Sequence, residues 1–187
     1  MKNFYEVHKD AFSSGQIDSK IWLCNELEKL FDQIDNVWIY GGWYATTAFL
    51  LRSRNNIDIK RIYSYDVDPL CESVADVINE NWLSKEWTFK AFTEDCNILT
   101  PKLGNPDLII NTSTEHFESM DWWNNIPTGT TVVLQGNNMP HDDHHIHTKN
   151  LKQFKKTFPL SKTLYEGQLD FNYPDWSFTR FMLIGVR

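Results

Sequence analysis

The spacing of hydrophobic residues near the start of the chain changes from that of a helix to that of a strand. A helix is predicted over about 17–34 by apolar residues that recur every three or four positions, namely Ile21, Cys24, Leu27, Leu30, Phe31 and Ile34. Short apolar runs follow at 37–40, 61–65 and 87–92, and each has the length of a buried strand. One initial helix therefore leads into a regular succession of strands.

Helices are predicted in the gaps between these strands. Residues 43–51 are expected to form one helix, and Asp68-Pro69 to start another, because aspartate caps free backbone amides and proline fits the first helical turn. The apolar stripe predicted for this second helix is Leu70, Val74, Val77, Ile78 and Trp82. Strands and helices thus alternate, which is the pattern of a parallel sheet.

The second half of the chain continues the alternation and then ends differently. Strands are predicted at 107–111 and 130–135, with a helix at 115–123 between them. An amphipathic helix follows, with Leu151 and Phe158 on its apolar side. The last two strands are predicted at 161–171 and 177–186. A turn-like sequence separates these two strands, so we expect them to pair antiparallel.

This order of elements predicts a single α/β domain over residues 1–187 with a Rossmann-like, doubly wound sheet. Five strands alternate with helices and are expected to be parallel, and the closing hairpin adds an antiparallel strand at the end of the chain. The predicted sheet is therefore seven-stranded and mostly parallel, and its last strand is antiparallel.

Glycines after the first predicted strand and an acid after the second mark a candidate ligand site. Gly41 and Gly42 follow the apolar run at 37–40, and Asp66 follows the run at 61–65. In a doubly wound sheet, glycine lets the backbone approach a ligand and the carboxylate accepts hydrogen bonds from ribose hydroxyls. These residues predict a nucleoside-containing cofactor; the alternative is a tight turn and a solvated strand end.

Composition and charge limit the partners that this chain can have. Its 187 residues are 41% hydrophobic and 23% charged, which is ordinary for a globular domain. A net charge of −7 disfavours nucleic acid as the main partner, because binding to the phosphate backbone needs a clustered positive surface. No apolar run is long enough to span a bilayer, and the first residues lack the apolar core of a signal peptide.

The three cysteines, Cys24, Cys71 and Cys96, are too few and too scattered for a disulfide framework or a metal cluster. We expect them to be free, buried thiols in a reducing compartment. Together with the missing membrane and export signals, they predict a cytoplasmic protein.

With these residues at these strand ends, the chain resembles the class I S-adenosylmethionine-dependent methyltransferases from about residue 37 to its end. The resemblance implies that the last strand lies next to the fifth, that the cofactor is S-adenosylmethionine, and that a cofactor half at about 37–100 precedes an acceptor half at about 105–187. The residues that it implies for cofactor binding are Tyr40, Gly41, Gly42, Asp66, Asp68, Asp95, Cys96 and Asn111.

The resemblance assigns a role to most of these positions. The glycine turn matches the motif that holds the methionine part, Asp66 the acid on the ribose, and Asp95 and Cys96 the contacts to the adenine. Asn111 ends a strand whose tip faces the methyl group in that family, and Asp68 has the alternative role of a helix cap. The chain departs from the family by having two adjacent glycines followed by Trp43, whose ring is expected to crowd a ligand unless it turns away.

Polar residues after the fourth and fifth predicted strands are expected to face the acceptor. Glu115 and His116 are predicted as catalytic residues, with His116 as a proton acceptor; the alternative is that they belong only to a helix cap. Asn137, Asn138 and His145 are predicted to bind the acceptor. The histidine-rich run at 141–147 has no established spacing of metal ligands, so no metal site is predicted.

The function that these observations predict is methyl transfer to a small-molecule acceptor. Two alternatives follow from the same cofactor and fold. The run Asp66-Val67-Asp68-Pro69 is similar to nicotianamine synthases, which transfer the aminobutyl group of the cofactor. Trp43 in the glycine turn favours a non-catalytic nucleoside-binding domain. A nicotinamide-dependent enzyme is disfavoured by the missing third glycine and by the closing hairpin.

Overall fold

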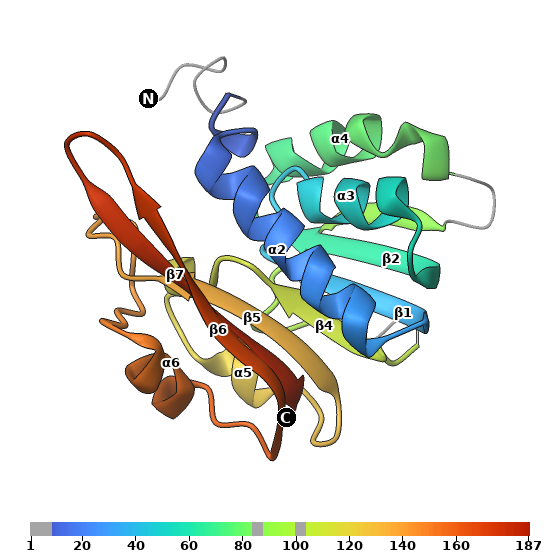
Figure 1. The fold of residues 1–187 in the computed structure, drawn as a ribbon. Helices are drawn as coiled ribbons and strands as arrows, with labels where there is room; N and C mark the ends of the chain where they lie inside the picture. Colours follow the sequence, from blue (N-terminus) through green and yellow to red (C-terminus); the bar gives the residue numbers. More distant parts are fainter. Residues whose placement is uncertain (1–8, 84–87, 100–103) are drawn as a thin grey trace.

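A seven-stranded sheet forms the centre of the computed structural model, which describes residues 9–83, 88–99 and 104–187 (Figure 1). Its strands are β1 (Gln33–Tyr40), β2 (Asp58–Asp66), β3 (Phe89–Thr93), β4 (Leu108–Asn111), β5 (Thr131–Asn137), β6 (Lys162–Asn172) and β7 (Ser177–Val186). They lie in the order β3-β2-β1-β4-β5-β7-β6. β7 runs antiparallel to both of its neighbours, and the other pairs are parallel. The predicted fold class, with the last strand next to the fifth, is confirmed.

Helices cover both faces of the sheet (Figure 1). The α-helices are α2 (Ser14–Leu30), α3 (Thr46–Arg54), α4 (Pro69–Ile78), α5 (Asp121–Asn124) and α6 (Leu151–Thr157), and the 3-10 turns are η1 (Glu80–Trp82) and η2 (Thr114–His116). Residues of α2, α3 and α4 share one hydrophobic cluster with the sheet, and residues of α5 and α6 share another. Among the helices described, none is long and apolar enough to cross a bilayer.

β1 is apolar at successive positions because both faces of the sheet are covered there. Val37 and Ile39 belong to the cluster under α2 and α3, whereas Trp38 and Tyr40 belong to the cluster under α5 and α6. Neighbouring side chains of a strand point to opposite faces, and both faces of this sheet are covered. β1 therefore lies in the middle of the fold, with its carboxyl end fixed by packing on both sides.

The first helix is shorter than its sequence pattern predicts. It ends at Leu30, and Phe31 already has an extended backbone with φ −139°. Ile34 is not helical but is paired with Ile59 in the parallel ladder between β1 and β2. The apolar spacing of a helix and of a buried strand overlap here, and the hydrogen bonds to β2 decide in favour of the strand.

Two further helix predictions are corrected by the structure. The helix expected at 43–51 begins only at Thr46, because Trp43 and Ala45 have left-handed backbones with φ 49° and 52°. The helix expected at 115–123 is replaced by η2 and the short α5. The Thr114 hydroxyl donates to the Gln135 carbonyl, and the Glu115 carbonyl accepts from the backbone amide of His145. These contacts hold η2 against β5 and the loop that follows it.

The cap of α4 is confirmed, and its apolar stripe is right only in part. The Asp68 carboxylate accepts a hydrogen bond from the Leu70 amide at 2.9 Å, as expected of a cap. The stripe residues that pack against buried clusters are Val74, Ile78 and Trp82. The fully buried positions of α4 are the small residues Cys71 and Ala75, while the Leu70 and Val77 side chains are exposed. The predicted start of the third strand at residue 87 lies outside the described residues.

This correction leads to a stability prediction for the exposed side of α4. Val77→Ser is expected to change the free energy of unfolding by less than about 0.5 kcal/mol, because a surface substitution removes little apolar burial. The Val77 side chain is 71% exposed. Urea denaturation followed by circular dichroism measures the change. A loss of several kcal/mol would show that this face of α4 is covered in solution.

Candidate functional site

A cavity of about 610 Å³ opens at the carboxyl ends of the parallel strands. Its wall is formed by the segments that follow β1, β2, β3, β4 and β5, by the N-terminal part of α2, and by Arg180 of β7. β1 and β4 are neighbours in the sheet, and the chain leaves them toward opposite sides. Such a switch point is where doubly wound sheets bind ligands. The predicted site and this cavity therefore occupy the same edge of the sheet.

The two glycines after β1 have different structural roles. Gly41 has a left-handed backbone with φ 58°, and a Cβ at this position would lie 2.9 Å from Ser113 Oγ and 3.1 Å from the Phe117 ring. Gly42 donates its amide to the Tyr65 carbonyl at 3.0 Å, and a Cβ there would overlap Ser64. Gly41 therefore keeps the cavity wall open, while Gly42 lets the turn pack onto β2.

Trp43 does not lie free in the glycine turn. Its ring stacks on the Tyr44 ring, with centroids 4.9 Å apart and an angle of 26° between the planes. Trp43 also packs against the small buried cluster of Ala11, Tyr44 and Cys71, the last of which belongs to α4. Trp43 lines the cavity at the same time. The expectation that its ring crowds a ligand therefore stays a prediction.

Asp66 joins the glycine turn to the end of β2. Its Oδ2 accepts from the Trp43 amide at 2.7 Å, and its Oδ1 accepts from the Asp68 amide at 3.0 Å. Burial raises the pKa of this carboxyl, and the amide hydrogen bonds counteract that rise. Because each carboxylate oxygen has a second lone pair, Asp66 can also accept a hydrogen bond from a ligand in the cavity.

Asp95 and Cys96 form the wall after β3. Asp95 Oδ1 accepts from the Asn97 amide at 2.8 Å, so this acid also shapes its own loop. Cys96 is buried beside it, and burial raises the pKa of its thiol to about 12. Both residues line the cavity. At neutral pH, Cys96 therefore presents a neutral thiol to this end of the cavity.

The opposite end of the cavity holds three buried charged residues, Lys20, Glu115 and Arg180, which are 5%, 2% and 5% exposed. The Glu115 Oε1 accepts from the Asn137 side-chain amide and lies 3.9 Å from Arg180 Nη1. Arg180 Nη1 also donates to the Thr112 carbonyl at 3.1 Å. These contacts tie η2, β5 and β7 together around the cavity, while Lys20 donates to the Gln16 side chain within α2 at 2.6 Å.

Burial dominates the titration of this group. It raises the pKa of Glu115 to about 7, and the neighbouring Arg180 counteracts the rise. Burial also lowers the pKa of Lys20 to about 7, and repulsion by Arg180 adds to that shift. Both groups therefore change charge near neutral pH, which is common for residues in a functional site.

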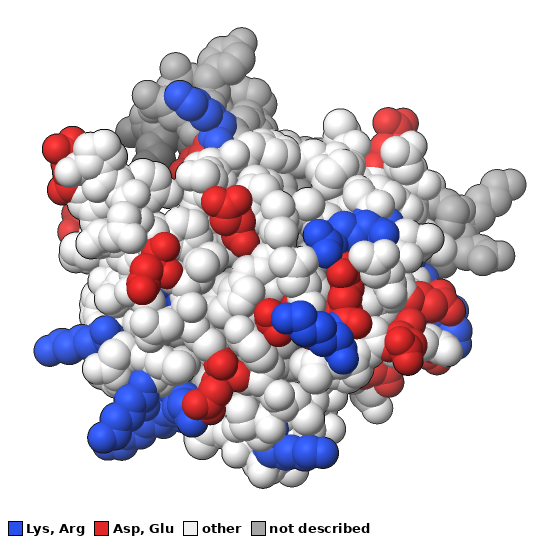
Figure 2. All heavy atoms as spheres, in the orientation of Figure 1, with Lys and Arg blue, Asp and Glu red and all other residues white. Residues whose placement is uncertain are grey.

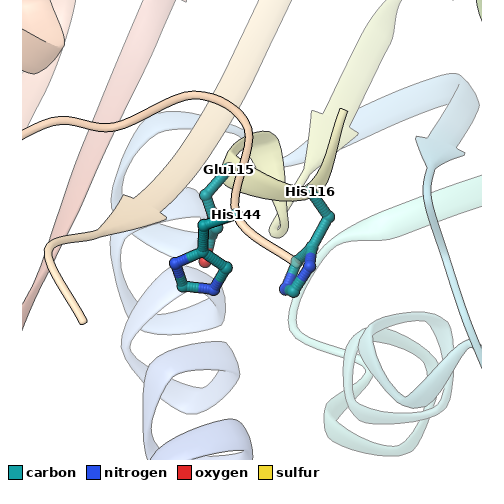
Figure 3. Close-up of side chains that lie close together, drawn as sticks. All are labelled: Glu115, His116 and His144. Atoms are coloured by element: carbon teal, nitrogen blue, oxygen red, sulfur yellow. The ribbon is translucent and has the colours of Figure 1, made fainter. Parts of the chain in front are cut away.

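The histidine-rich run at 141–147 lies in the loop between β5 and α6, and part of it reaches the cavity. The backbone amides of His145 and Ile146 donate to the Glu115 carbonyl at 2.7 and 3.1 Å. These bonds bring His144 beside His116, with ring centroids 4.7 Å apart (Figure 3). His144 is 5% exposed, and burial lowers its pKa to about 4. His144, rather than the predicted His145, lines the cavity.

Eight of the thirteen predicted site residues line the cavity: Gly41, Gly42, Asp66, Asp95, Cys96, Glu115, His116 and Asn137. The five that do not line it are Tyr40, Asp68, Asn111, Asn138 and His145.

Four of the five residues outside the cavity wall have structural roles, and the fifth, His145, has an exposed side chain. Tyr40 packs in the core, and Asp68 caps α4. Asn111 accepts from the Ser113 amide at 2.9 Å, and Asn138 accepts from the Thr179 amide at 2.7 Å. His145 contributes its backbone amide, while its side chain is exposed. The cavity wall does not include these five residues, and their predicted ligand contacts stay predictions.

The most informative cavity residues that the sequence analysis missed are Lys20, Ser113, Phe117, His144 and Arg180. One of them carried a usable signal. Arg180 stands within a strand whose following residues are all apolar up to Gly185. An isolated charge at the end of a buried apolar run needs a partner, and so it indicates a buried pair or a ligand.

Solved structures with the same fold were found by structural comparison. The N-methyltransferase NodS from Bradyrhizobium japonicum WM9 is 12% identical, with a TM-score of 0.68, and the match covers 94% of this chain and 98% of that chain. NodS in complex with S-adenosylhomocysteine is also 12% identical, with a TM-score of 0.69 and coverage of 93% and 89%.

A third match is magnesium protoporphyrin IX methyltransferase (ChlM) from Synechocystis PCC 6803 with bound S-adenosylmethionine. It is 12% identical, with a TM-score of 0.62, and the match covers 99% of this chain and 85% of that chain. No protein-family model matches the sequence, and no curated protein matches it either. At this level of identity, the comparisons show a shared fold over nearly the whole chain.

Proposed function

We propose that this chain, which has the fold of the class I S-adenosylmethionine-dependent methyltransferases, is itself a methyltransferase that uses S-adenosylmethionine and acts on a small-molecule acceptor. The observation that carries the proposal is the cavity itself, because Gly41 and Asp66 line it together at the carboxyl ends of β1 and β2. The matching structures that hold S-adenosylhomocysteine or S-adenosylmethionine support the choice of cofactor.

The cavity fits such a cofactor in three ways. Its volume of about 610 Å³ lies within the usual range of small-molecule sites. Gly41 leaves a gap between Ser113 and Phe117 that a Cβ would fill. Acidic residues outnumber the two cationic ones, Lys20 and Arg180, on the cavity wall, and this surplus suits a ligand with a positive sulfonium; the acidic residues are Asp10, Asp66, Asp95, Glu115, Glu118 and Asp143.

The two ends of the cavity have separate tasks in this proposal. Gly41, Asp66 and Asp95 would hold the nucleoside cofactor, which supplies an electrophilic methyl group when bound. Glu115, Asn137 and Arg180 would orient the acceptor at the other end. Methyl transfer from a sulfonium depends mainly on alignment and on exclusion of water, so a buried, hydrogen-bonded wall is the contribution that this chain needs to make.

His116 has the properties of a proton acceptor at this end. Burial lowers the pKa of its imidazole, so the ring is neutral at pH 7 and has a lone pair available. The side chain is exposed toward the cavity, in contrast to that of Glu115. An acceptor that loses a proton during methylation can therefore pass it to His116.

The charge distribution supports a small acceptor rather than a nucleic acid. On the face shown in Figure 2, basic side chains of the described residues stand in separate small groups with acidic side chains between them. The net charge of −7 adds to this picture. Binding to a phosphate backbone depends on clustered positive charge. The cavity at the carboxyl edge of the sheet is the better candidate for the acceptor site.

The proposal predicts that the purified chain binds S-adenosylhomocysteine and S-adenosylmethionine but not NAD. Isothermal titration calorimetry with the three ligands measures this directly. Gly41→Val is expected to weaken binding of both sulfur ligands, because its side chain meets Ser113 and Phe117 and strains a left-handed backbone. Binding of NAD alone would favour a nicotinamide enzyme.

Product analysis separates methyl transfer from aminobutyl transfer once turnover is detected. Methyl transfer leaves S-adenosylhomocysteine, whereas aminobutyl transfer leaves methylthioadenosine. Cofactor binding without turnover of any acceptor would favour the non-catalytic domain. The stacking of Trp43 on Tyr44 supports the catalytic interpretation, because it gives the Trp43 ring a partner in the protein.

A further inference from the structure

Three side chains at the acceptor end of the cavity lie close enough to share one ion. Glu115, His116 and His144 each offer one ligand atom, and these atoms lie within 4.8 Å of one another. Figure 3 shows Glu115 and His116 extending from η2 and His144 from the loop after β5. With bonds of about 2.0–2.2 Å in a tetrahedral site, two ligand atoms stand roughly 3.3–3.6 Å apart, so side-chain shifts of up to roughly 1.5 Å complete the geometry.

Glu115 has one carboxylate oxygen that its protein neighbours leave unused. Its Oε1 accepts from Asn137 and lies near Arg180, as described above. Its Oε2 is buried and has no hydrogen-bond partner among the residues that the structure describes. A buried, unpartnered carboxylate oxygen is costly unless a cation or a donor binds it.

The two imidazole rings meet at this end of the cavity. The His116 and His144 rings pack edge to face, with centroids 4.7 Å apart and an angle of 86° between their planes. His116 lines the cavity from η2, and His144 lines it from the loop after β5. A neutral imidazole carries one unprotonated ring nitrogen, which is the atom that binds a metal ion.

We propose that Glu115, His116 and His144 bind a divalent transition-metal ion such as Zn²⁺ at the acceptor end of the cavity. Two imidazoles and one carboxylate are a donor set that suits such ions. Lys20 and Arg180 add positive charge nearby, and the more numerous carboxylates of the cavity wall offset it. The prediction from the sequence that no metal site is present is replaced by this proposal.

Three protein ligands leave at least one coordination position open toward the cavity. A hydroxyl group that binds there has a lowered pKa, because the ion stabilises the deprotonated oxygen. This role rests on the proposed function, and it points to acceptors that present a hydroxyl group to the ion. With the ion bound, it takes the place of proton uptake by His116, because the free ring nitrogen of His116 is then a metal ligand. The backbone hydrogen bonds from the loop after β5 to the Glu115 carbonyl then hold His144 close to the other two ligands.

The test is a titration of chelator-treated protein with Zn²⁺ and with Co²⁺, followed by calorimetry and by the visible absorption of Co²⁺. We expect one ion to bind per chain. His116→Ala and His144→Ala are each expected to lower the affinity for Zn²⁺ roughly 100-fold. His147→Ala is the matched control, because His147 is an exposed residue of the same run outside the cavity wall. This variant is expected to bind Zn²⁺ with unchanged affinity.

The same samples are titrated with S-adenosylhomocysteine in the absence of metal, which also verifies that each variant is folded. Failure of the unmodified chain to bind either ion overturns the metal site, as does full Zn²⁺ affinity in both His116→Ala and His144→Ala. Neither result touches the proposed function while S-adenosylhomocysteine still binds. Zn²⁺ binding without any S-adenosylhomocysteine binding would overturn the proposed function and leave the metal site standing.

Discussion

Replacing Arg180 with Met is expected to lower the free energy of unfolding by about 3–5 kcal/mol at about pH 8.5, because one partner of a buried ion pair is removed. Arg180 and Glu115 are both almost fully buried, and their side chains approach to 3.9 Å. The Met side chain fills much of the volume of the arginine stem. What the variant loses is therefore mainly the positive charge that faces Glu115.

The loss is expected to be smaller at about pH 5.5, for a reason that follows from linkage. Burial raises the pKa of Glu115 in the folded protein to about 7, above its ordinary value of 4.5. A raised pKa means that stability is highest at low pH, where the carboxyl is protonated, and declines as the pH rises through 7. Without Arg180 the pKa rises further, so the decline continues to higher pH. Urea denaturation at both pH values measures the difference, and equal losses would contradict this account.

Lys20→Met is the matched control, since its pH dependence has the opposite sign. Burial lowers the pKa of Lys20 from 10.5 to about 7. Neutral Lys20 is therefore tolerated at high pH, and the wild type loses stability as the pH falls from 10.5 through 7. Relative to the wild type, Lys20→Met should be more stable near pH 7 than near pH 10. The two variants together distinguish the effect of Glu115 titration on stability from the effect of Lys20 titration.

The strands were predictable because their sequence reflects a local requirement. Residues 37–40 and 108–110 are apolar at successive positions, and β1 and β4 are buried on both faces of the sheet. The helices were predicted less well where local spacing was not decisive. Ile34 fits a helical stripe and a strand equally, and only its pairing with Ile59 decides between them.

The cofactor end of the site was predictable for the same local reason. Gly41, Asp66 and Asp95 follow the ends of three neighbouring strands, and the order of strands brings those ends together. The acceptor end depends on contacts between distant segments. Lys20 comes from a helix that precedes the sheet, where a lysine usually marks a solvated face. Arg180 comes from β7, the last strand in the chain.

His144 shows the same limit within a single loop. The sequence offers four histidines between 141 and 147, and their spacing does not distinguish among them. The choice is made by the hydrogen bonds from His145 and Ile146 to the Glu115 carbonyl, which place His144 against the cavity and leave the His145 side chain exposed. These are contacts between residues thirty positions apart in the chain, and no periodicity records them.

Asp66→Ala is expected to weaken the binding of S-adenosylhomocysteine by about 2–4 kcal/mol, because charge-assisted hydrogen bonds to the ribose are lost. The structure adds a second cause. Asp66 also holds the Trp43 amide at 2.7 Å and the Asp68 amide at 3.0 Å, so its removal loosens the turn that carries Gly41 and Gly42.

Asp68→Ala is the control for a change of structure near this turn, because Asp68 caps α4 through the Leu70 amide and does not line the cavity. It is expected to cost about 1 kcal/mol of stability and to leave the affinity for S-adenosylhomocysteine nearly unchanged. Calorimetry on both variants, with thermal unfolding on the same samples, measures the two effects. Unchanged affinity in Asp66→Ala would move the ribose to another part of the cavity. A similar loss of affinity in both variants would mean that binding responds to the structure around α4 and the glycine turn, and it would contradict a specific contact between the Asp66 carboxylate and the ribose.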